Sequence, residues 1–487
     1  MPGLDCGPMR LDELAGAVPA PRVLGAGSAE VTALAYDSRK VHPGTLFFCV
    51  PGEKVDGHEF GPGAVADGAA ALVVERELEV TVPQLLVPDA RAAMAPLAAR
   101  FWGEPSRELQ VVGVTGTNGK TTTAFLVREI LEAGRTACGL LGTVKQVVGG
   151  VEEEVERTTP EAIELQATLR RMVAAGDRAC AMEVSSHALT LHRCDAIEFE
   201  VAIFTNLTQD HLDFHADMEE YFQAKRRLFE FGPQTAIVNV DDPYGRRLAE
   251  EFECLTFSAE GAAADFSARE VGFDAGGARF LVGETEVRTG LPGHFNVANA
   301  LGAFAAAVAL GVPAHQAAAG LARASRVPGR FEPVDEGQRF AVLVDYAHTP
   351  DSLENVLLAA RRLTEGRLIS VFGAGGDRDR DKRPKMGRVG AELSDLAIVT
   401  SDNPRSEDPE AIVAEVAAGA PEGTGVEVEV DRRAAIARAL ALAEPEDTVV
   451  IAGKGHEQGQ EFADGRKIPF DDREVAREEL RKLGSPA

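Results

Sequence analysis

Long hydrophobic runs are missing from this 487-residue sequence, and its first residues form no apolar segment. No stretch approaches the roughly 18 apolar residues in a row that a membrane-spanning helix requires. Asp5, Arg10 and Asp12 bring charge to positions where a secretion signal would need an apolar core. We therefore expect a cytoplasmic protein with no membrane span.

Cysteine is scarce, and the six cysteines are scattered without any Cys-x-x-Cys pair. Such pairs are typical of zinc-binding and redox sites. Several of the cysteines lie in apolar runs, where reduced thiols are commonly buried. The pattern favours a protein whose chemistry does not depend on thiols.

Basic residues are outnumbered, with 50 Lys and Arg against 77 Asp and Glu and a formal net charge of −27. Contact with nucleic acid or anionic lipid favours a basic surface. The charge balance therefore argues against general nucleic-acid and membrane-surface binding. A basic pocket can still exist inside an acidic protein.

The chain is too long for one hydrophobic core, so several domains are expected. Its strand and helix patterns divide it into three segments. We place the segments at 1–104, 105–330 and 331–487. Short apolar strands alternate with helical patterns in the last two, which predicts an α/β fold with parallel sheets and crossover helices. The predicted strands are 71–75, 84–87, 110–115, 178–184, 201–206, 235–240, 341–344, 367–372, 396–400 and 448–452, and a clear helix is predicted at 299–310.

The most informative stretch is 111–123, Val-Val-Gly-Val-Thr-Gly-Thr-Asn-Gly-Lys-Thr-Thr-Thr. An apolar strand leads into a glycine-rich turn and a helix start, which is the arrangement that cradles phosphate groups. Gly116 and Gly119 let the backbone approach phosphate oxygens. Lys120 can then reach the β- and γ-phosphates, while the Thr121 hydroxyl can bind Mg²⁺. The usual first glycine of this motif is a valine here, but the sequence predicts ATP binding and a central domain of the P-loop type.

We consider four further residues of the central segment for metal chemistry. Glu183 ends a predicted strand, where a carboxylate commonly holds Mg²⁺. His211 and His215 have a spacing that suits zinc on a helix, but no glutamate lies between them and no cysteine is near, so a histidine assisting Mg²⁺ is favoured. Lys225, taken alone, is typical of a lysine on a helix surface.

Polar residues follow four predicted strands of the third segment. In open parallel sheets, ligands bind at the carboxyl ends of the strands. Four such groups predict a binding face in a Rossmann-like C-terminal domain. They are Asp345 and His348, Asp377 and Arg378, Asn403 and Arg405, and Lys454, His456 and Glu457.

Taken together, these motifs resemble the Mur ligases of peptidoglycan synthesis, and they cover nearly the whole chain in the family's order. The segments that carry the resemblance are 115–122, 183–187, 205–215, 239–242, 291–299 and 345–350. Segments 37–39, 43–47, 375–379, 402–405 and 453–457 resemble the family member that adds a diamino acid. The resemblance implies roles in cell wall biogenesis, cell shape and cell division, with small-molecule substrates and a monomeric enzyme.

The resemblance also implies which residues bind ATP and metal. Lys225 matches a lysine that family members carry as a CO₂ carbamate, which turns a cation into an oxygen ligand and overturns the surface interpretation. Thr121 and Glu183 would serve one Mg²⁺, and Glu183, His211 and carbamylated Lys225 a second, with Lys120, Glu183, His211 and Lys225 as the catalytic set. The implied ATP-binding residues are Thr115, Gly116, Thr117, Asn118, Gly119, Lys120, Thr121, Thr122, Asn296, Asn299, Arg330, Asp345 and His348.

The other substrates have implied positions too. The UDP-muramoyl-dipeptide would contact Ser38, Thr158, Thr159, Ser185 and Arg193, and the diamino acid Arg378, Asp402, Asn403, Pro404, Arg405, Gly453 and Glu457. Two residues depart from the pattern, because Arg157 stands where relatives often have Asn and Leu191 where some have Gln. These departures concern the sugar and glutamyl contacts rather than the type of reaction.

The implied reaction is ATP-dependent amide formation through an acyl phosphate, with meso-diaminopimelate as the amine. Arg378 and Arg405 can bind its distal carboxylate while Glu457 holds its ammonium. Lysine and ornithine lack that carboxylate and would leave Arg405 without a partner, at a cost of roughly 1–3 kcal/mol. They remain alternatives, as do a folylpolyglutamate-synthase-like ligase, another member of the Mur ligase family and a non-enzymatic nucleotide-binding regulator.

Overall fold

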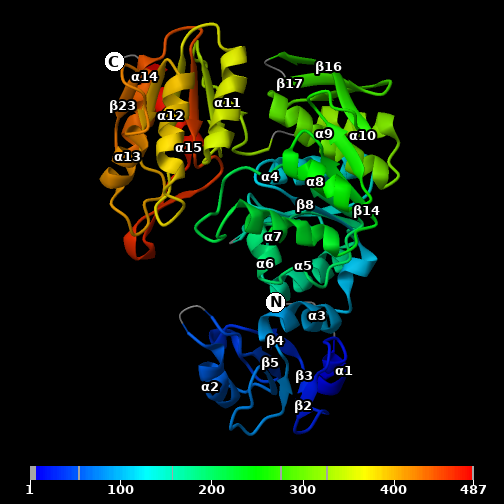
Figure 1. Ribbon diagram of the computed structural model, residues 1–487. Coiled ribbons are helices and arrows are strands. Elements are labelled where there is room, and N and C mark those ends of the chain that lie inside the picture. The colour runs from blue at the N-terminus through cyan, green and yellow to red at the C-terminus, as the bar shows by residue number, and fades with distance from the viewer. Residues whose placement is uncertain (1–6, 53–54, 156, 275–276, 325–326, 485–487) are drawn as a thin grey trace. The chain divides into compact units, whose positions relative to one another are not determined.

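The computed structural model of the chain describes residues 7–52, 55–155, 157–274, 277–324 and 327–484 (Figure 1). By its internal contacts the chain divides into two compact units. The first unit consists of Met1–Thr115, Arg135–Ile203 and Ala224–Ala236. The second unit consists of Gly116–Gly134, Phe204–Gln223 and Ile237–Ala487.

A five-stranded sheet with strand order β2-β7-β6-β5-β4 forms the N-terminal part of the first unit. β2 is antiparallel to β7, and the other pairs are parallel. Every residue of the apolar strands β5 and β6 is buried, as expected where helices cover a parallel sheet. The elements are β1 (Met9–Arg10), α1 (Leu11–Ala15), β2 (Arg22–Leu24), β3 (Glu30–Val31), β4 (Ala33–Ala35), β5 (Thr45–Phe48), α2 (Gly61–Ala66), β6 (Ala71–Val74), β7 (Gln84–Leu86) and α3 (Ala90–Phe101).

The first unit also contains five strands of a second sheet, in the order β11-β10-β9-β12-β8. β8, β12 and β9 are parallel, while β10 and β11 form an antiparallel extension. The elements are β8 (Gln110–Thr115), β9 (Cys138–Leu141), β10 (Gln146–Val148), β11 (Val151–Glu153), α5 (Ala162–Ala175), β12 (Ala179–Glu183) and α6 (Ser186–Thr190). Three elements contain residues of both units, namely β13 (Val201–Phe204), α7 (Met218–Glu230) and β14 (Thr235–Asn239).

The second unit begins with a helical layer and an antiparallel meander. Helices α4 and α10 approach closely, because a Cβ on Gly320 would lie 2.8 Å from Ile130 Cα. β16, β17 and β18 pair in antiparallel order after the parallel strand β15. The elements are α4 (Lys120–Ala133), α8 (Pro243–Glu251), β15 (Leu255–Ser258), β16 (Phe266–Asp274), β17 (Gly277–Val282), β18 (Thr285–Thr289), α9 (His294–Ala309) and α10 (Ala314–Arg323).

A six-stranded sheet with the order β19-β20-β24-β21-β22-β23 completes the second unit. Only β19 is antiparallel within it. Helices α11, α12 and α13 contribute to the core on one face, and α14 and α15 to the core on the other (Figure 1). The elements are β19 (Glu332–Pro333), β20 (Ala341–Asp345), α11 (Pro350–Leu363), β21 (Leu368–Phe372), α12 (Lys382–Leu393), β22 (Leu396–Val399), α13 (Pro409–Ala417), β23 (Val426–Val428), α14 (Arg432–Leu442), β24 (Thr448–Ala452), β25 (Gly459–Glu461), β26 (Lys467–Pro469) and α15 (Asp472–Gly484).

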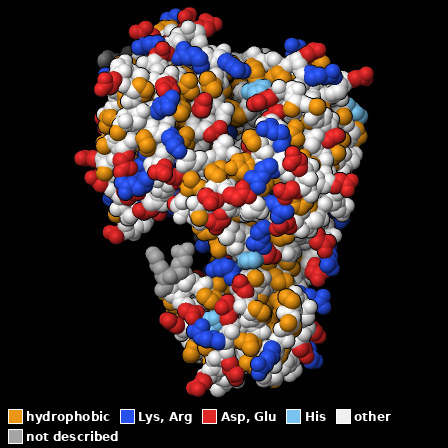
Figure 2. Space-filling view, viewed as in Figure 1, with side chains coloured by type: hydrophobic (Ala, Val, Ile, Leu, Met, Phe, Trp, Pro, Cys, Tyr) orange, Lys and Arg blue, Asp and Glu red, His pale blue; other side chains and the backbone are white. Residues whose placement is uncertain are grey.

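The predicted α/β fold is confirmed, and each predicted strand exists with ends that differ by at most a few residues. The helix predicted at 299–310 begins earlier, at His294, because Gly293 has a φ of 98° and starts it there. Within the described ranges, no helix is long and apolar enough to cross a membrane. On the face seen in Figure 2, Lys and Arg side chains are interspersed with Asp and Glu.

Candidate active site

The glycine-rich turn lies between the end of β8 at Thr115 and the start of α4 at Lys120. Gly116 has a φ of 147° and Gly119 a φ of 87°. A Cβ on Gly116 would lie 1.9 Å from Thr205 Oγ1, and one on Gly119 would lie 2.2 Å from an Asn299 side-chain oxygen. Both positions therefore require glycine, and a helix N-terminus such as the start of α4 is suited to bind an anion.

Lys120 folds back over this turn. Its Nζ donates to the carbonyls of Gly116 at 2.9 Å and Thr117 at 2.8 Å. The neighbouring Thr121 hydroxyl accepts a hydrogen bond of 2.9 Å from Arg330 Nη2. The structure thus brings the predicted nucleotide residue Arg330 to the first turn of α4.

A cavity of about 170 Å³ in the second unit is lined by Asn118, Gly119 and Asn299. Asn296 does not line it. Its amide donates to Pro292 O at 2.8 Å and accepts from Asn299 Nδ2 at 3.1 Å. Asn296 therefore orients Asn299 instead of facing the cavity.

The sequence interpretation missed Asp351, which also lines this cavity. Its carboxylate accepts a hydrogen bond of 2.7 Å from Asn118 Nδ2. Burial raises the pKa of Asp351 above its usual range. Its position directly after the Asp345–Pro350 motif, at the start of α11, could have identified Asp351 as a site residue.

Two residues predicted to bind the nucleotide lie elsewhere. Asp345 accepts from the backbone N–H groups of Phe331 at 2.7 Å and Ala347 at 2.8 Å, and it lines neither cavity described here. His348 lines a second cavity, which contains the predicted diamino-acid residues. Asp345 thus supports the backbone, and His348 faces a different cavity.

Glu183 is 1% exposed at the end of β12 in the first unit. Its carboxylate accepts from Thr143 N at 2.7 Å and Thr143 Oγ1 at 3.1 Å. A Cβ on Gly142 would lie 2.6 Å from Glu183 Oε1, so the small residue makes room for the carboxylate. Sequence reasoning missed Thr143, which lies in the segment after β9.

The structure brings four of the five predicted dipeptide residues together beside Glu183. Thr159 Oγ1 donates to Glu183 O at 2.8 Å, and Ser185 N donates to Thr159 Oγ1 at 3.2 Å. Thr158 Oγ1 lies 3.0 Å from Thr143 Oγ1, and Arg193 Nη1 donates to Thr159 O at 3.0 Å.

Carboxylates accompany two of the predicted dipeptide residues, Glu161 beside Arg193 and Asp37 beside Ser38. Arg193 also contacts Glu161, with Nη2 2.7 Å from Oε1. The fifth predicted dipeptide residue, Ser38, lies in a separate short 3₁₀ helix capped by Asp37. Hydrogen bonding to Arg39 lowers the pKa of Asp37 to about 2, so this cap is ionised.

The two residues that depart from the family pattern take structural positions in the first unit. Arg157 Nη1 lies 3.5 Å from Glu161 Oε1. Leu191 caps the C-terminal end of α6.

The remaining metal candidates lie on α7 and in the segment before it. Lys225 is 1% exposed, so its interpretation as a surface lysine is wrong. The histidines 211 and 215 are not on a helix, and His211 has a φ of 55°. His215 stacks on Tyr221 with ring centroids 5.0 Å apart. No cluster of three or more metal-binding His, Cys, Asp or Glu occurs in the described part of the chain.

The second cavity, of about 160 Å³, collects charged side chains at the carboxyl ends of β21, β22 and β24. It combines cations and anions, as the sequence predicts for a diamino-acid site. Pro404 is buried beside it. The lining residues are Asp210, His211, Tyr346, His348, Gly375, Arg378, Lys382, Asp402, Asn403, Arg405, Gly453 and Glu457.

Lys454 connects the two loops that line this cavity, and its side chain is 0% exposed. Its Nζ donates to Asn403 Oδ1 at 2.7 Å and to Glu457 Oε2 at 3.0 Å. Burial pushes the pKa of Asp402 upward, but Lys454 and Arg432 outweigh burial and hold it below its usual range. Asp402 is therefore a fixed anion beside the cavity.

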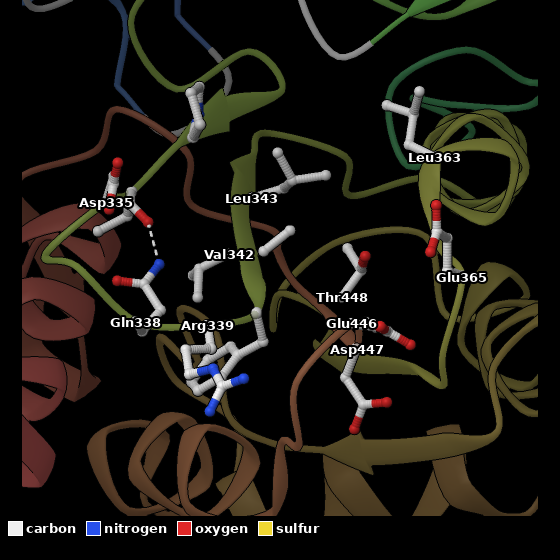
Figure 3. Close-up of a pocket in the computed structure, with 14 residues that line it drawn as sticks. Asp335, Gln338, Arg339, Val342, Leu343, Leu363, Glu365, Glu446, Asp447 and Thr448 are labelled. Atoms are coloured by element: carbon white, nitrogen blue, oxygen red, sulfur yellow. Dashed lines mark hydrogen bonds between the residues drawn. The ribbon is translucent and has the colours of Figure 1, made fainter.

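A larger cavity, of about 500 Å³, lies at the other end of this sheet (Figure 3). It includes Ala341 and Thr448, the first residues of β20 and β24. Ligands of open parallel sheets bind at the carboxyl ends of strands, so this cavity is not the candidate site.

Three family models match the chain in succession. They are the Mur ligase family, catalytic domain, at residues 30–102, the Mur ligase middle domain at 114–307, and the Mur ligase, glutamate ligase domain, at 329–455. Together they extend over most of the sequence.

Curated proteins and solved structures agree with these models. The chain is 50% identical to the UDP-N-acetylmuramoyl-L-alanyl-D-glutamate–2,6-diaminopimelate ligase of Gloeobacter violaceus, over 94% of this chain and 95% of the relative. It is 49% identical to the Streptomyces coelicolor protein of the same name, over 94% of each. A solved structure of a ligase with this name is 31% identical, with a TM-score of 0.70 over 99% of this chain and 100% of that one. The chain belongs to the Mur ligase family of ATP-dependent amide ligases.

Proposed function

We propose that the chain joins meso-diaminopimelate to the D-glutamyl γ-carboxylate of UDP-N-acetylmuramoyl-L-alanyl-D-glutamate. The observation that carries the proposal is the second cavity. There, Arg378 and Arg405 offer cations for a distal carboxylate, and Asp402 and Glu457 offer anions for an ammonium. The names of the Gloeobacter and Streptomyces relatives support the same substrate over lysine or ornithine.

The reaction has two steps. The substrate γ-carboxylate attacks the γ-phosphorus of ATP and releases ADP, which leaves an acyl phosphate. The amine of the diamino acid then attacks the acyl carbon, loses a proton, and expels phosphate through a tetrahedral intermediate. Lys120 neutralises the approaching anions in the first step, exchanging its backbone carbonyl partners for phosphate oxygens.

Each unit contains an oxygen ligand that suits Mg²⁺. The Thr121 hydroxyl in the second unit and the buried Glu183 carboxylate in the first are hard oxygen ligands. Mg²⁺ supplies charge neutralisation and alignment of the phosphates when bound. We assign both residues, with His211, to metal binding, and Asn118, Gly119 and Asn299 to ATP.

We propose that Lys225 is carbamylated by CO₂. The reaction joins the neutral amine nitrogen to the carbon of CO₂ and releases one proton. The buried position of Lys225 supports the assignment, because a carbamate is an oxygen ligand where an ammonium would be a second cation near metal.

We further propose three domains with boundaries at 1–104, 105–330 and 331–487, supported by the succession of the family models. The muramoyl-dipeptide is assigned to the group formed by Thr158, Thr159, Ser185 and Arg193, with Ser38 for its uridine nucleotide. We expect the enzyme to act as a monomer in the cytoplasm, where ATP is available.

A phosphate-release assay tests the proposal. Purified protein receives ATP, Mg²⁺ and the UDP-muramoyl-dipeptide, with meso-diaminopimelate, L-lysine or L-ornithine in parallel. We expect release with diaminopimelate and little with the other two. A clear preference for lysine or ornithine refutes the amino-acid assignment, and release with a folate substrate in place of the dipeptide indicates the rival ligase.

The carbamate has its own test. Lys225→Ala should lose activity by roughly a hundredfold or more, the size expected when a charge-stabilising group is removed. Added short carboxylic acids should restore part of it by supplying the missing oxygens. Loss without any rescue, in a protein with an unchanged melting temperature, contradicts the carbamate.

A further inference from the structure

Strand β25 supports the loop Asp402–Arg405, called here the diamino-acid loop. Gln460 Nε2 donates to Asp402 O at 2.6 Å, and Glu461 N donates to Asn403 Oδ1 at 3.0 Å. Arg405 N donates to Glu461 O at 3.1 Å. β25 pairs with β26 in a two-stranded ribbon, so Glu461 belongs to a separate element that contacts the loop.

The Glu461 side chain also reaches the Arg405 guanidinium. Arg405 Nε lies 3.3 Å from Glu461 Oε2, and Arg405 Nη1 donates to Gly376 O at 2.7 Å. A guanidinium has five N–H donors, so the Nη2 group and one Nη1 hydrogen remain for a ligand. Arg405 has a φ of 51°, and its backbone bond to β25 holds this unusual conformation.

These contacts change the reason for discriminating against lysine. A diamino acid without a distal carboxylate does not leave Arg405 without a partner, because Glu461 and Gly376 already accept its hydrogen bonds. The distal carboxylate of diaminopimelate must instead share Arg405 with the Glu461 carboxylate. Selectivity therefore depends on how much of the Arg405 charge Glu461 neutralises.

We propose that Glu461 is a specificity-determining residue of the diamino-acid site, an inference that rests on the proposed function. Its carboxylate reduces the attraction of Arg405 for a second carboxylate. It also attracts the terminal ammonium of lysine and so reduces the repulsion from Arg405. Glu461 thereby narrows the preference for diaminopimelate over lysine.

The test is Glu461→Gln, which keeps an acceptor oxygen for Arg405 Nε but removes the charge. The ratio of kcat/KM for meso-diaminopimelate to that for L-lysine is measured by phosphate release at constant ionic strength. We expect this ratio to rise about tenfold, since a partly exposed charge a few ångströms from the ligand has an effect of this order. The change should appear as a lower KM for diaminopimelate with kcat nearly constant.

Two further variants separate charge from structure. Glu427→Gln removes a carboxylate on β23 of the six-stranded sheet, where it pairs with Arg438 of α14 at 3.2 Å, and it should leave the ratio unchanged. Glu461→Asp keeps the charge but withdraws it from Arg405, so it should raise the ratio less than Glu461→Gln does. If Glu461→Gln is unstable, Glu461→Asp alone still tests the direction.

The outcomes are distinct. A ratio that is unchanged or falls in Glu461→Gln, or a KM that rises equally for both amino acids, overturns the inference. A wild-type enzyme that does not use diaminopimelate refutes the proposed function instead.

Discussion

In the phosphate loop, residues 116–122, the groups that would face a ligand are backbone N–H groups and the side chains of Asn118, Lys120 and Thr121, which are close together in sequence. Gly116 and Gly119 shape it, and Lys120 bonds to carbonyls three and four residues away. In the diamino-acid loop, the ligand groups are side chains held by residues about fifty positions away, such as Lys454 on Asn403. The first site therefore depends on backbone space, and the second on the balance of charge.

The largest effect should come from filling space in the phosphate loop. Gly119→Ala places a Cβ 2.2 Å from an Asn299 side-chain oxygen at a φ of 87°. Losing well-placed N–H donors should reduce kcat/KM for ATP by roughly a hundredfold or more, measured by phosphate release. The KM for diaminopimelate should change little.

Gly423→Ala is the matched control, because Gly423 has a φ of 84° with nothing within 4 Å of an added Cβ. It carries the strain of positive φ without the clash. Equal activity losses in the two variants would show that backbone strain, not space at the phosphates, limits the phosphate loop.

The second-largest effect should come from removing the buried Lys454 ammonium, which bonds to the diamino-acid loop. Lys454→Met leaves Glu457 and Asp402 without a cation that is 0% exposed. Breaking a buried charge cluster costs about 3 kcal/mol, so the melting temperature should fall. The KM for diaminopimelate should rise roughly tenfold, because Asn403 and Glu457 lose their common donor.

The KM for ATP separates a local effect from general unfolding, and it should stay near the wild-type value in Lys454→Met. Lys467→Met, at an exposed position on β26, provides the control for loss of a lysine. If Lys454→Met raises both KM values together, the two sites are not independent as the comparison assumes.

The phosphate loop could be predicted from sequence because strand, turn and helix start are contiguous. The four strand ends of the C-terminal sheet were predicted for the same reason. The pairing of Arg405 with Glu461 could not be predicted, since the sequence does not show which of many carboxylates lies next to a given arginine in the fold. Likewise, Asn296 was predicted to bind ATP, but its amide donates to Pro292 O just before α9.

The burial of Lys225 could have been predicted from the apolar residues around it in the sequence. Buried aromatic and aliphatic residues lie three and four positions to either side of it on α7, namely Tyr221, Phe222, Leu228 and Phe229. Residues at these spacings share one face of a helix, so Lys225 had to lie on the buried face. The surface interpretation weighed its charge and neglected this periodicity.

The smallest effect is the pH dependence of stability, and it should arise from the second cavity and not from the phosphate loop. Burial and the nearby Lys382 lower the pKa of His348, while Asp210, with Oδ2 3.8 Å from Nε2, opposes them in part. The hydrogen bond of 2.8 Å between His348 Nδ1 and Tyr346 O also opposes this lowering in part, but the pKa stays below its usual value. The unfolded chain therefore takes up a proton on this histidine at higher pH than the folded chain does.

Stability from the neutral His348 should be complete above the unfolded pKa of about 6.5 and should be lost as the pH falls below it. The difference in melting temperature between wild type and His348→Gln should thus shrink between pH 8 and pH 5.5. The phosphate loop contains no histidine or carboxylate, so Gly119→Ala should keep a constant difference from wild type across the same series. A His348→Gln difference that is flat, or that grows as the pH falls, would mean that the second cavity does not penalise the added charge.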